Sequence, residues 1–550
     1  MKRHIISLAV ATLCLASCEL DRQPETVLVD SNFWKSETDF RGACNRLYVD
    51  LNGFGQDYRA DDIITSSPNS VSSGNWTVPG TAGDWTNPYT KIATCNNIVN
   101  KITASTADEK KKARWIAEAR FFRAYHYFDL VRKYGDVPLI LSVFTSTSDP
   151  DIKMPRTSRE EVIKQCYEDL DYAYQNLPDI DKLTSETDWG RVSKSAALAL
   201  TTRIGLYEGT YSKYHNLGSD YKAHLQHAVT AAETLIKSGK HNLYPDYAKM
   251  FLFDGEGRQN KENILVKIYG PNESGTITHN NSRTLENAAS VTRQAVEQYL
   301  YVDGLPREKS PLAIKDEKSF NDIFTNRDPR LGLTIFRLSE EAYKGAYIPF
   351  TNQHGNGFPI KKGYMADQWQ TNGKETVDKM LIRYAEVLLS YAEALYKLNG
   401  NINDTQLDQT VNAVRKRSGM TATLTNAFAT ANNLSILEEI RRERLVEFMD
   451  EGIRYDDIIR WKIAEKVLPT AKLGIKLIAS ETTSDPETLA ARITSGGGMF
   501  NGQKVCDQDS VYVIEAADTR SFNTSRDYLY PIPSYEIGTS DGNLEQNPNW

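Results

Sequence analysis

Carboxylates and arginines crowd one stretch near the C-terminus, EEIRRERLVEFMDEGIRYDDIIRW at 438–461. Paired carboxylates beside arginines could form an acid–base site. However, Leu445, Phe448 and Met449 mark a buried face, and arginine lowers the pKa of a neighbouring carboxyl, whereas a general acid needs a raised pKa. We therefore predict ion pairs around a core and no catalytic centre. The residues concerned are Glu439, Arg442, Glu443, Glu447, Arg454, Asp456, Asp457 and Arg460.

Two further patterns are similar to reactive sites but lack essential partners. GTSDG at 538–542 matches the G-x-S-x-G nucleophile elbow, which needs a histidine later in the chain, and none follows. His224 and His227 stand three apart and could face one metal ion, but no third ligand lies near them in the sequence. No HExxH, Walker or dinucleotide motif is present. We predict no catalytic residue, no bound metal and no cofactor.

The element that must position the rest is AEARFFRAYHYFDLVRKYGDVPLI at 117–140. At 100° per residue its apolar and aromatic side chains cover almost every side, which is typical of a helix packed by neighbours on several faces. Asp129 precedes Lys133 by four, the favourable order for an ion pair on a helix. Gly135 is placed for a left-handed C-cap, and Pro138 prevents the helix from restarting. The aromatic side chains of this helix are predicted to be core.

The remaining patterns predict helices on both sides of an irregular insert. Helices are expected at 36–51, 89–102, 159–176, 190–208 and 221–238, and then a pair at about 381–399 and 407–418. Residues 52–84 form a loop rich in Gly, Ser, Pro and Asn. Residues 244–378 are loop-rich, with short β-like runs such as 264–269. The fold class is mainly α, a tetratricopeptide-like helical-repeat scaffold (about 31–243 and 379–550) with a large loop-rich insert and a few short strands.

Composition excludes some functions. The formal net charge is −7, or −9 without the N-terminal segment that carries Lys2 and Arg3. An acidic chain without a Lys/Arg stripe is not expected to bind nucleic acid. Cys44, Cys95, Cys166 and Cys506 are scattered singly, so we expect buried thiols and neither a disulfide framework nor a metal site.

The N-terminus has the pattern of an exported protein. A basic start and the apolar run 5–15, too short to span a bilayer, precede Leu-Ala-Ser-Cys at 15–18. This pattern resembles a bacterial lipobox, in which Cys18 is acylated and becomes the first mature residue. We therefore expect a signal peptide at 1–17, and a lipid anchor and tether at 18–30.

Several blocks together resemble the SusD/RagB family of outer-membrane nutrient-binding lipoproteins. Besides the Cys18 lipobox and the central helix, they are FWKSETDFRGACNRLY at 33–48, YTKIATCNNIVNKI at 89–102, NRDPRL at 326–331, IRYAEVLLSYAEAL at 382–395, ERLVEFMDEGIRYDDIIRW at 443–461, YLYPIPSYEI at 528–537 and LEQNPNW at 544–550. The blocks occur in the family's order and span nearly the whole mature chain. Trp550 is a small departure, since relatives often end with tyrosine.

The resemblance implies a single SusD-like domain over 31–550 on the cell surface. It implies a protein that is not an enzyme but binds glycans, or peptides in some relatives, on a loop-rich face. It also implies pairing with a TonB-dependent SusC-type outer-membrane transporter, over which the protein acts as a hinged lid. Glu19 and Asp21, after Cys18, are similar to the surface-export signal of such lipoproteins.

Sugar recognition has its own chemical signature. Pyranose rings stack on aromatic planes, and their hydroxyls suit planar groups such as Arg, Asp and Asn. The loop at 52–84 offers such a set, in which Trp76 has no apolar periodicity around it: Arg59, Asp61, Asn75, Trp76 and Asp84. In the insert the candidates are Tyr269, Asn272, Asn280 and Trp369. We predict these nine residues as ligand contacts.

Three hypotheses follow, of which the first is preferred. The protein captures an oligosaccharide or polysaccharide for the transporter. Alternatively it is an oligopeptide receptor of the same family, or a surface glycoside hydrolase, which would need two carboxylates at a defined separation in a cleft.

Overall fold

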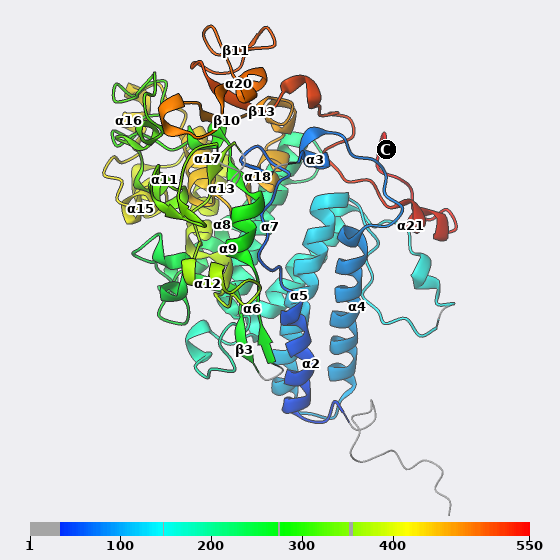
Figure 1. Cartoon of the computed structure of the whole chain (residues 1–550). Coiled ribbons are helices and arrows are strands. Elements are labelled where there is room, and N and C mark those ends of the chain that lie inside the picture. Colours follow the sequence, from blue (N-terminus) through cyan, green and yellow to red (C-terminus); the bar gives the residue numbers. More distant parts are fainter. Residues whose placement is uncertain (1–32, 66, 147, 273–274, 351–355) are drawn as a thin grey trace, which may run out of the picture.

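The computed structural model describes residues 33–65, 67–146, 148–272, 275–350 and 356–550. The predicted signal peptide, Cys18 and the tether lie outside these ranges. The fold is mainly helical, as predicted, with short strands between the helices (Figure 1). Within the described residues, no helix has the length and apolarity needed to cross a membrane.

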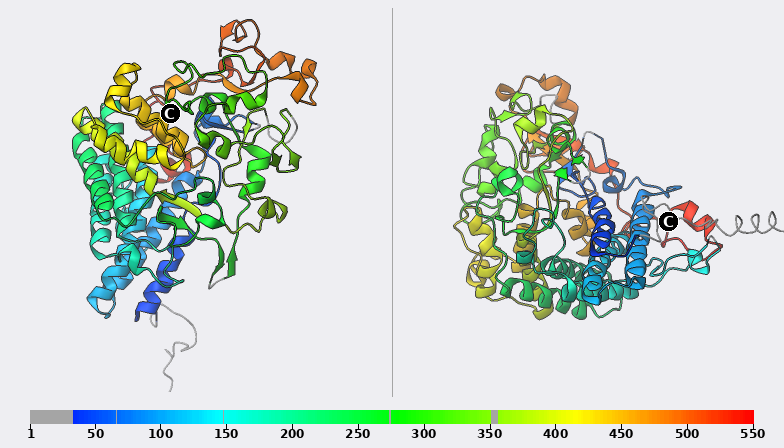
Figure 2. Two further views of the ribbon diagram at one scale, coloured as in Figure 1. Left: turned by 90° about the vertical axis from the view of Figure 1, so that its left-hand side faces the viewer. Right: turned by 90° about the horizontal axis from the view of Figure 1, so that it is seen from below.

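The first part of the scaffold consists of long helices packed on their neighbours in the chain. In sequence order, α4 packs on α5, α5 on α6, and α7 on α8, while α2 covers α4 and α5. Seen from below, the helices form a curved row (Figure 2). Their bounds are α2 Glu37–Val49, α3 Ser70–Ser73, α4 Gly83–Ala104, α5 Glu109–Tyr134, α6 Arg159–Asn176, α7 Lys194–His215 and α8 Tyr221–Lys237.

The central helix α5 begins earlier than predicted, because the Asp108 side chain caps it by accepting hydrogen bonds from the N–H groups of Lys110 and Lys111. Its buried residues lie on every side, which confirms the all-round apolar pattern. Gly135 ends the helix with φ 74° and ψ −117°, so its φ is positive as expected, but its conformation is not the predicted left-handed one.

The insert is closed at its base by two strands. β2 (Asn263–Lys267) pairs antiparallel with β9 (Lys379–Arg383), which directly follows the insert. Inside lie the hairpin β3–β4 (Gly270–Asn272, Gly275–Ile277), the hairpin β6–β7 (Glu341–Ala342, Gly345–Ala346), and the helices α9 (Asn281–Ala288), α10 (Arg293–Val296), α11 (Pro329–Thr334) and α12 (Ala366–Gln370). A small sheet, β1 (Ile63–Ile64), β5 (Ser290–Val291) and β8 (Phe358–Pro359), joins the 52–84 loop to the insert.

The C-terminal part returns to helices. α13 (Tyr384–Asn399) ends at Gly400, which has the left-handed conformation. The partner predicted at 407–418 is broken at Thr410 (φ −123°, ψ −90°) into two pieces. The remaining bounds are α14 Asp404–Gln409, α15 Val411–Arg417, α16 Asn426–Ala431, α17 Ile436–Glu447, α18 Arg454–Arg460, α19 Ala464–Val467, β10 Lys472–Lys476, α20 Pro486–Leu489, β11 Met499–Phe500, β12 Gln503–Lys504, β13 Val511–Glu515 and α21 Ser534–Thr539.

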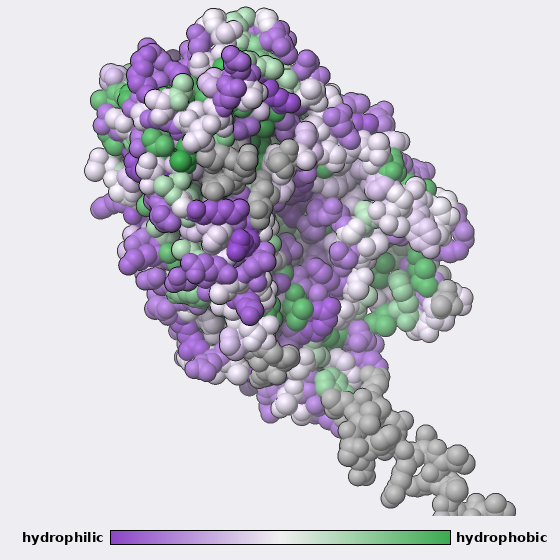
Figure 3. Space-filling model, viewed as in Figure 1, coloured by the Kyte–Doolittle hydropathy of each residue, from purple (hydrophilic) through white to green (hydrophobic). Residues whose placement is uncertain are grey.

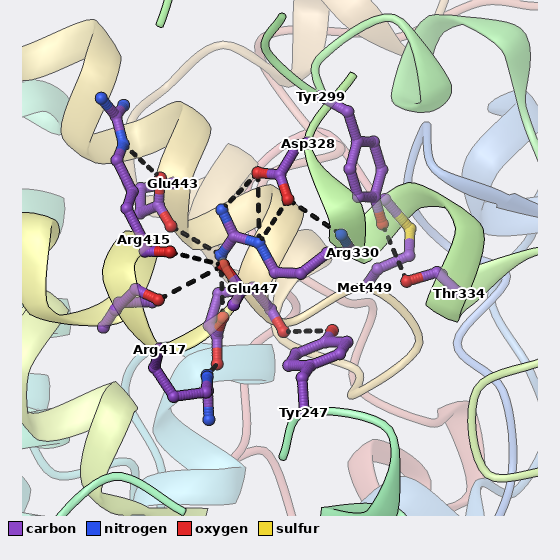
Figure 4. A network of polar contacts seen from close by, with 12 residues as sticks. Tyr247, Tyr299, Asp328, Arg330, Thr334, Arg415, Arg417, Glu443, Glu447 and Met449 are labelled. Carbon is purple, nitrogen blue, oxygen red and sulfur yellow. Dashed lines mark hydrogen bonds and ion pairs between the residues drawn. The ribbon is translucent and has the colours of Figure 1, made fainter. Parts of the chain in front are cut away.

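A buried ionic network joins the insert to this helical part (Figure 4). Glu447 of α17 accepts from Arg330 of α11 at 2.8 Å, from Arg383 of β9 at 2.6 Å and from Arg417 of α15. Arg330 also forms ion pairs with Asp328 and Glu443, both at 2.6 Å. The prediction that the charges at 438–461 form ion pairs around a core is therefore confirmed. The three buried arginines hold the pKa of Glu447 far below its usual range although burial alone would raise it.

Candidate functional site

A cleft of about 390 Å³ lies between the central helix and the segment that follows α2. Tyr125, Phe128, Asp129 and Arg132 of α5 form one wall, because positions i, i+3, i+4 and i+7 share one helix face. Other lining residues come from α7, α13 and α18, and the opposite wall includes residues 379–381 of β9. The space-filling view shows a largely hydrophilic hollow between the two sides of the molecule (Figure 3).

Charged side chains in this cleft are paired with one another. Lys133 contacts Asp129 at 3.1 Å, as predicted, and also Asp84 at 2.6 Å. Arg132 binds Asp129 at 2.6 Å and also pairs with Asp456. Burial raises the pKa of Asp129, but Lys133 and Arg132 outweigh this effect and hold the pKa well below its usual range. Asp129 is therefore an ionised hydrogen-bond acceptor and not a general acid.

Two of the predicted ligand residues, Arg59 and Asp84, line the cleft. Arg59 is held by both oxygens of Asp57, at 2.8 and 2.7 Å, and donates to the hydroxyl of Tyr530 at 2.9 Å. Its guanidinium also lies over the ring of Tyr455 at 4.3 Å. Both predicted residues are thus fixed in place by neighbours while facing the same open space.

Trp76 does not line the cleft itself but packs on Tyr530, which does. Its half-buried indole meets the rings of Tyr530 and Trp550 edge to face, each at 4.9 Å between centroids, and donates to Asp527 at 3.2 Å. Tyr530 itself lines the cleft. The predicted residue Asn75 is exposed beside Trp76 and donates to the hydroxyl of Ser73 at 3.3 Å. We call Trp76, Tyr530 and Trp550 the aromatic rim.

The sequence reasoning missed Tyr530 and Trp550. Tyr530 lies in the block YLYPIPSYEI and Trp550 ends the block LEQNPNW, and both blocks indicate only the family resemblance. Each residue is more than 450 positions from Trp76, so no local pattern could indicate that they meet.

The remaining candidates, like Asn75 and Trp76, lie outside the cleft lining. Asp61 forms a two-point ion pair with Arg454 at 2.7 and 2.8 Å, which lowers the pKa of Asp61 to about 2 against the effect of burial. Tyr269 is buried against His279, with 4.6 Å between ring centroids. The indole of Trp369 lies under the guanidinium of Arg283 at 4.0 Å and donates to a carboxylate oxygen at 2.7 Å.

Two asparagines complete the set. Asn280 accepts a hydrogen bond from the N–H of Gly373 at 3.1 Å, and Asn272 pairs with Gly275 across the β3–β4 hairpin. Within the described part of the chain, the residues that line the cleft include none from the insert at 244–378.

A smaller cavity of about 60 Å³ adjoins the cleft, with Gly55 and Lys379 in both linings. Burial raises the pKa of its two aspartates, Asp378 and Asp450, to about 7. This volume admits a few water molecules but no sugar ring. Among the described residues, no group of three or more His, Cys, Asp or Glu side chains could hold a metal ion. His224 instead contacts Tyr167 and Glu160, at 3.0 and 3.1 Å.

Comparison with known proteins gives a consistent result. A model of the SusD family matches residues 251–550, and a second model, described as "Starch-binding associating with outer membrane", matches residues 44–206. A SusD-like protein from Bacteroides ovatus is 25% identical over 500 residues, which cover 84% of this chain and 83% of that protein. SusD-like protein P2 from Formosa agariphila is 23% identical over the full length of both chains.

Solved structures agree. A SusD-like carbohydrate-binding protein from Bacteroides fragilis superposes with a TM-score of 0.74 at 25% identity, covering 92% of this chain and 98% of that chain. A laminarin-binding SusD-like protein has the same fold, with a TM-score of 0.64 at 19% identity, covering 94% and 100% of the two chains.

Proposed function

Because the chain belongs to the SusD family, we propose that it is a lipid-anchored cell-surface protein that binds a glycan and delivers it to a TonB-dependent SusC-type transporter. The mature protein would be anchored through Cys18, with residues 31–550 as one domain. The observation that carries the glycan assignment is the aromatic rim, of which Tyr530 lines a polar cleft, since sugars stack on aromatic planes and exchange hydrogen bonds with oriented polar groups. The carbohydrate-binding relative from B. fragilis supports the same assignment.

Isothermal titration against a panel of neutral and acidic polysaccharides tests glycan binding. Removal of one stacking partner costs about 1 kcal/mol, so Trp76→Ala should weaken binding of the best glycan about fivefold. Trp369→Ala is the matched control, because it removes another half-buried tryptophan, one that packs on Arg283 and not on the cleft-lining Tyr530. Equal affinity in wild type and Trp76→Ala would rule out the aromatic rim as the sugar platform.

Two related assays address the alternatives. Binding of a peptide library with no response to any glycan would favour the oligopeptide receptor. New reducing ends after incubation with the bound glycan would favour the hydrolase, for which Asp378 and Asp450, whose pKa values are raised to about 7, would be the first residues to replace.

The anchor has its own test. Cys18→Ala should abolish incorporation of radiolabelled palmitate, whereas Cys506→Ala, which removes a half-buried thiol in the C-terminal part, should not. Retained label in the Cys18 variant would refute lipidation at this residue.

A further inference from the structure

Exposed apolar side chains gather on one edge of the molecule. They come from the loop between α5 and α6, the segment after Trp76, and α21, and Figure 3 shows apolar side chains around the first of these. Tyr535 is 62% exposed and Ile152 41%. We call this set the outer apolar patch: Val78, Leu141, Val143, Phe144, Ile152 and Tyr535.

The chain holds this patch in place from beneath. The hydroxyl of Tyr127 in α5 donates to the carbonyl of Ile140 and accepts from its N–H, both at 2.7 Å. Asn96 of α4 donates to the same carbonyl at 2.9 Å, and Val137 and Thr157 form a β-bridge at the base of the loop. Hydrogen bonds thus fix the base of the loop, while the apolar side chains at its tip remain exposed.

The three segments are also connected to one another. The N–H groups of Ser534 and Tyr535 donate to the carbonyls of Pro79 and Gly80, both at 3.0 Å. Lys153 forms an ion pair with Asp541. Contiguous exposed apolar surface held by such contacts is typical of a protein interaction site, because its burial is favourable by about 25 cal/mol per Å².

The charges around the patch are mainly acidic. Asp149, Asp151 and Glu536 lie on its segments, and Glu545 follows α21. Arg156 donates to the carbonyls of Asp136, Glu545 and Tyr134 and to the side-chain oxygen of Asn547, so its hydrogen bonds are used within the protein. An acidic edge repels an anionic lipid surface and complements a basic protein surface.

The patch lies close to the aromatic rim along the chain. Val78 and Pro79 follow Trp76 of the aromatic rim by two and three residues, and Tyr535 follows Tyr530 by five. A protein that hands a ligand to a partner must turn its ligand-bearing face to that partner. We propose that the outer apolar patch docks on the transporter, through a transporter surface that is apolar at its centre and basic at its edge; this inference rests on the proposed function.

Photo-crosslinking in the native outer membrane tests the surface. A benzophenone amino acid at Phe144, Ile152 or Tyr535 should form crosslinks to a TonB-dependent barrel, identified by mass spectrometry, at least fivefold above control positions. The controls are Leu217 and Val302, which are apolar and 49% and 40% exposed but lie on other segments. The double variant Phe144→Glu/Tyr535→Glu should reduce co-purification of the barrel at least tenfold, with an unchanged melting temperature.

The possible failures are distinguishable. If the barrel co-purifies with the wild-type protein but crosslinks equally to patch and control positions, the docking surface is wrong and the proposed function survives. Crosslinks from the patch only to a second copy of this chain, or to lipid, also overturn the docking surface. If no TonB-dependent barrel co-purifies with the wild-type protein, the transporter part of the proposed function fails, and this inference fails with it.

Discussion

Glu447 is the buried carboxylate on which the insert and the helical scaffold converge, and its replacement by glutamine should be strongly destabilising. The substitution keeps the size of the side chain and one acceptor oxygen but removes the charge. Arg330, Arg383 and Arg417 all contact this carboxylate. The variant therefore leaves one buried positive charge in excess.

The magnitude follows from the burial of the network. Loss of one partner from a buried pair costs about 3–5 kcal/mol, and the retained amide oxygen places Glu447→Gln at about 3 kcal/mol. Glu438→Gln is the matched control, because Glu438 lies on the same helix in an exposed pair with Arg441 at 2.9 Å. Exposed pairs contribute about 0–1 kcal/mol, so the control should remain within that range.

The dependence on pH gives a second measurement. The pKa of Glu447 is lowered in the folded protein, so its contribution is fully present above the unfolded pKa of about 4.3 and is lost as the pH falls from there towards the folded value. The difference in unfolding free energy between wild type and variant should therefore be largest at pH 7 and decrease below about pH 4.5. Urea denaturation followed by circular dichroism measures both quantities. A loss below about 1 kcal/mol at pH 7, or a difference that grows as the pH falls, would refute this account.

Two further predictions concern packing. Gly205→Ala should destabilise the protein by about 1–3 kcal/mol in urea denaturation, because a Cβ at Gly205 of α7 would lie 2.6 Å from the carbonyl oxygen of His224 in α8. Gly42→Ala in α2 is the control, because a Cβ at Gly42 would meet only Phe33, at 4.0 Å. It should be neutral or stabilising by up to about 1 kcal/mol. A destabilised control would contradict the packing argument. In the native mature protein, a disulfide reagent should label the half-buried Cys506 first and the other three thiols only on unfolding. The reason is that these three thiols are buried and that burial raises their pKa. Early labelling of any of the three would show that its helix opens. The three are Cys44, Cys95 and Cys166.

Sequence patterns predicted those parts of the fold whose signals are local. Ser158 caps α6 and Pro178 follows its end, so the predicted bounds 159–176 agree with the structure. The break at Thr410 was not predicted, because the apolar spacing continues through it. The expectation of buried thiols is confirmed for three cysteines, while Cys506 is only half-buried.

The candidate site depends on contacts that no local pattern encodes. Residue chemistry alone selected Trp76, Arg59 and Asp84; in the structure Trp76 and Arg59 both contact Tyr530, and Asp84 lines the same cleft as Tyr530. The same reasoning selected Asp61, but its carboxylate serves Arg454, which is nearly 400 residues away in the sequence. A charged loop residue has the same sequence signature whether its partner is a ligand or a distant side chain.

The central helix α5 is part of the core and also lines the cleft. Tyr125 and Phe128, predicted as core, are half-buried and buried respectively, and also line the cleft. On the same helix, Asp129 and Lys133 form the predicted pair, and Lys133 also pairs with Asp84 of the neighbouring helix α4. Such a paired surface offers fixed donors and acceptors without a strong net field, an arrangement that suits a neutral polyhydroxyl ligand, whose hydroxyl groups can both donate and accept. An acidic glycan would have to compete with carboxylates already bound to these cations, so in the titration panel neutral glycans should bind more tightly than acidic ones.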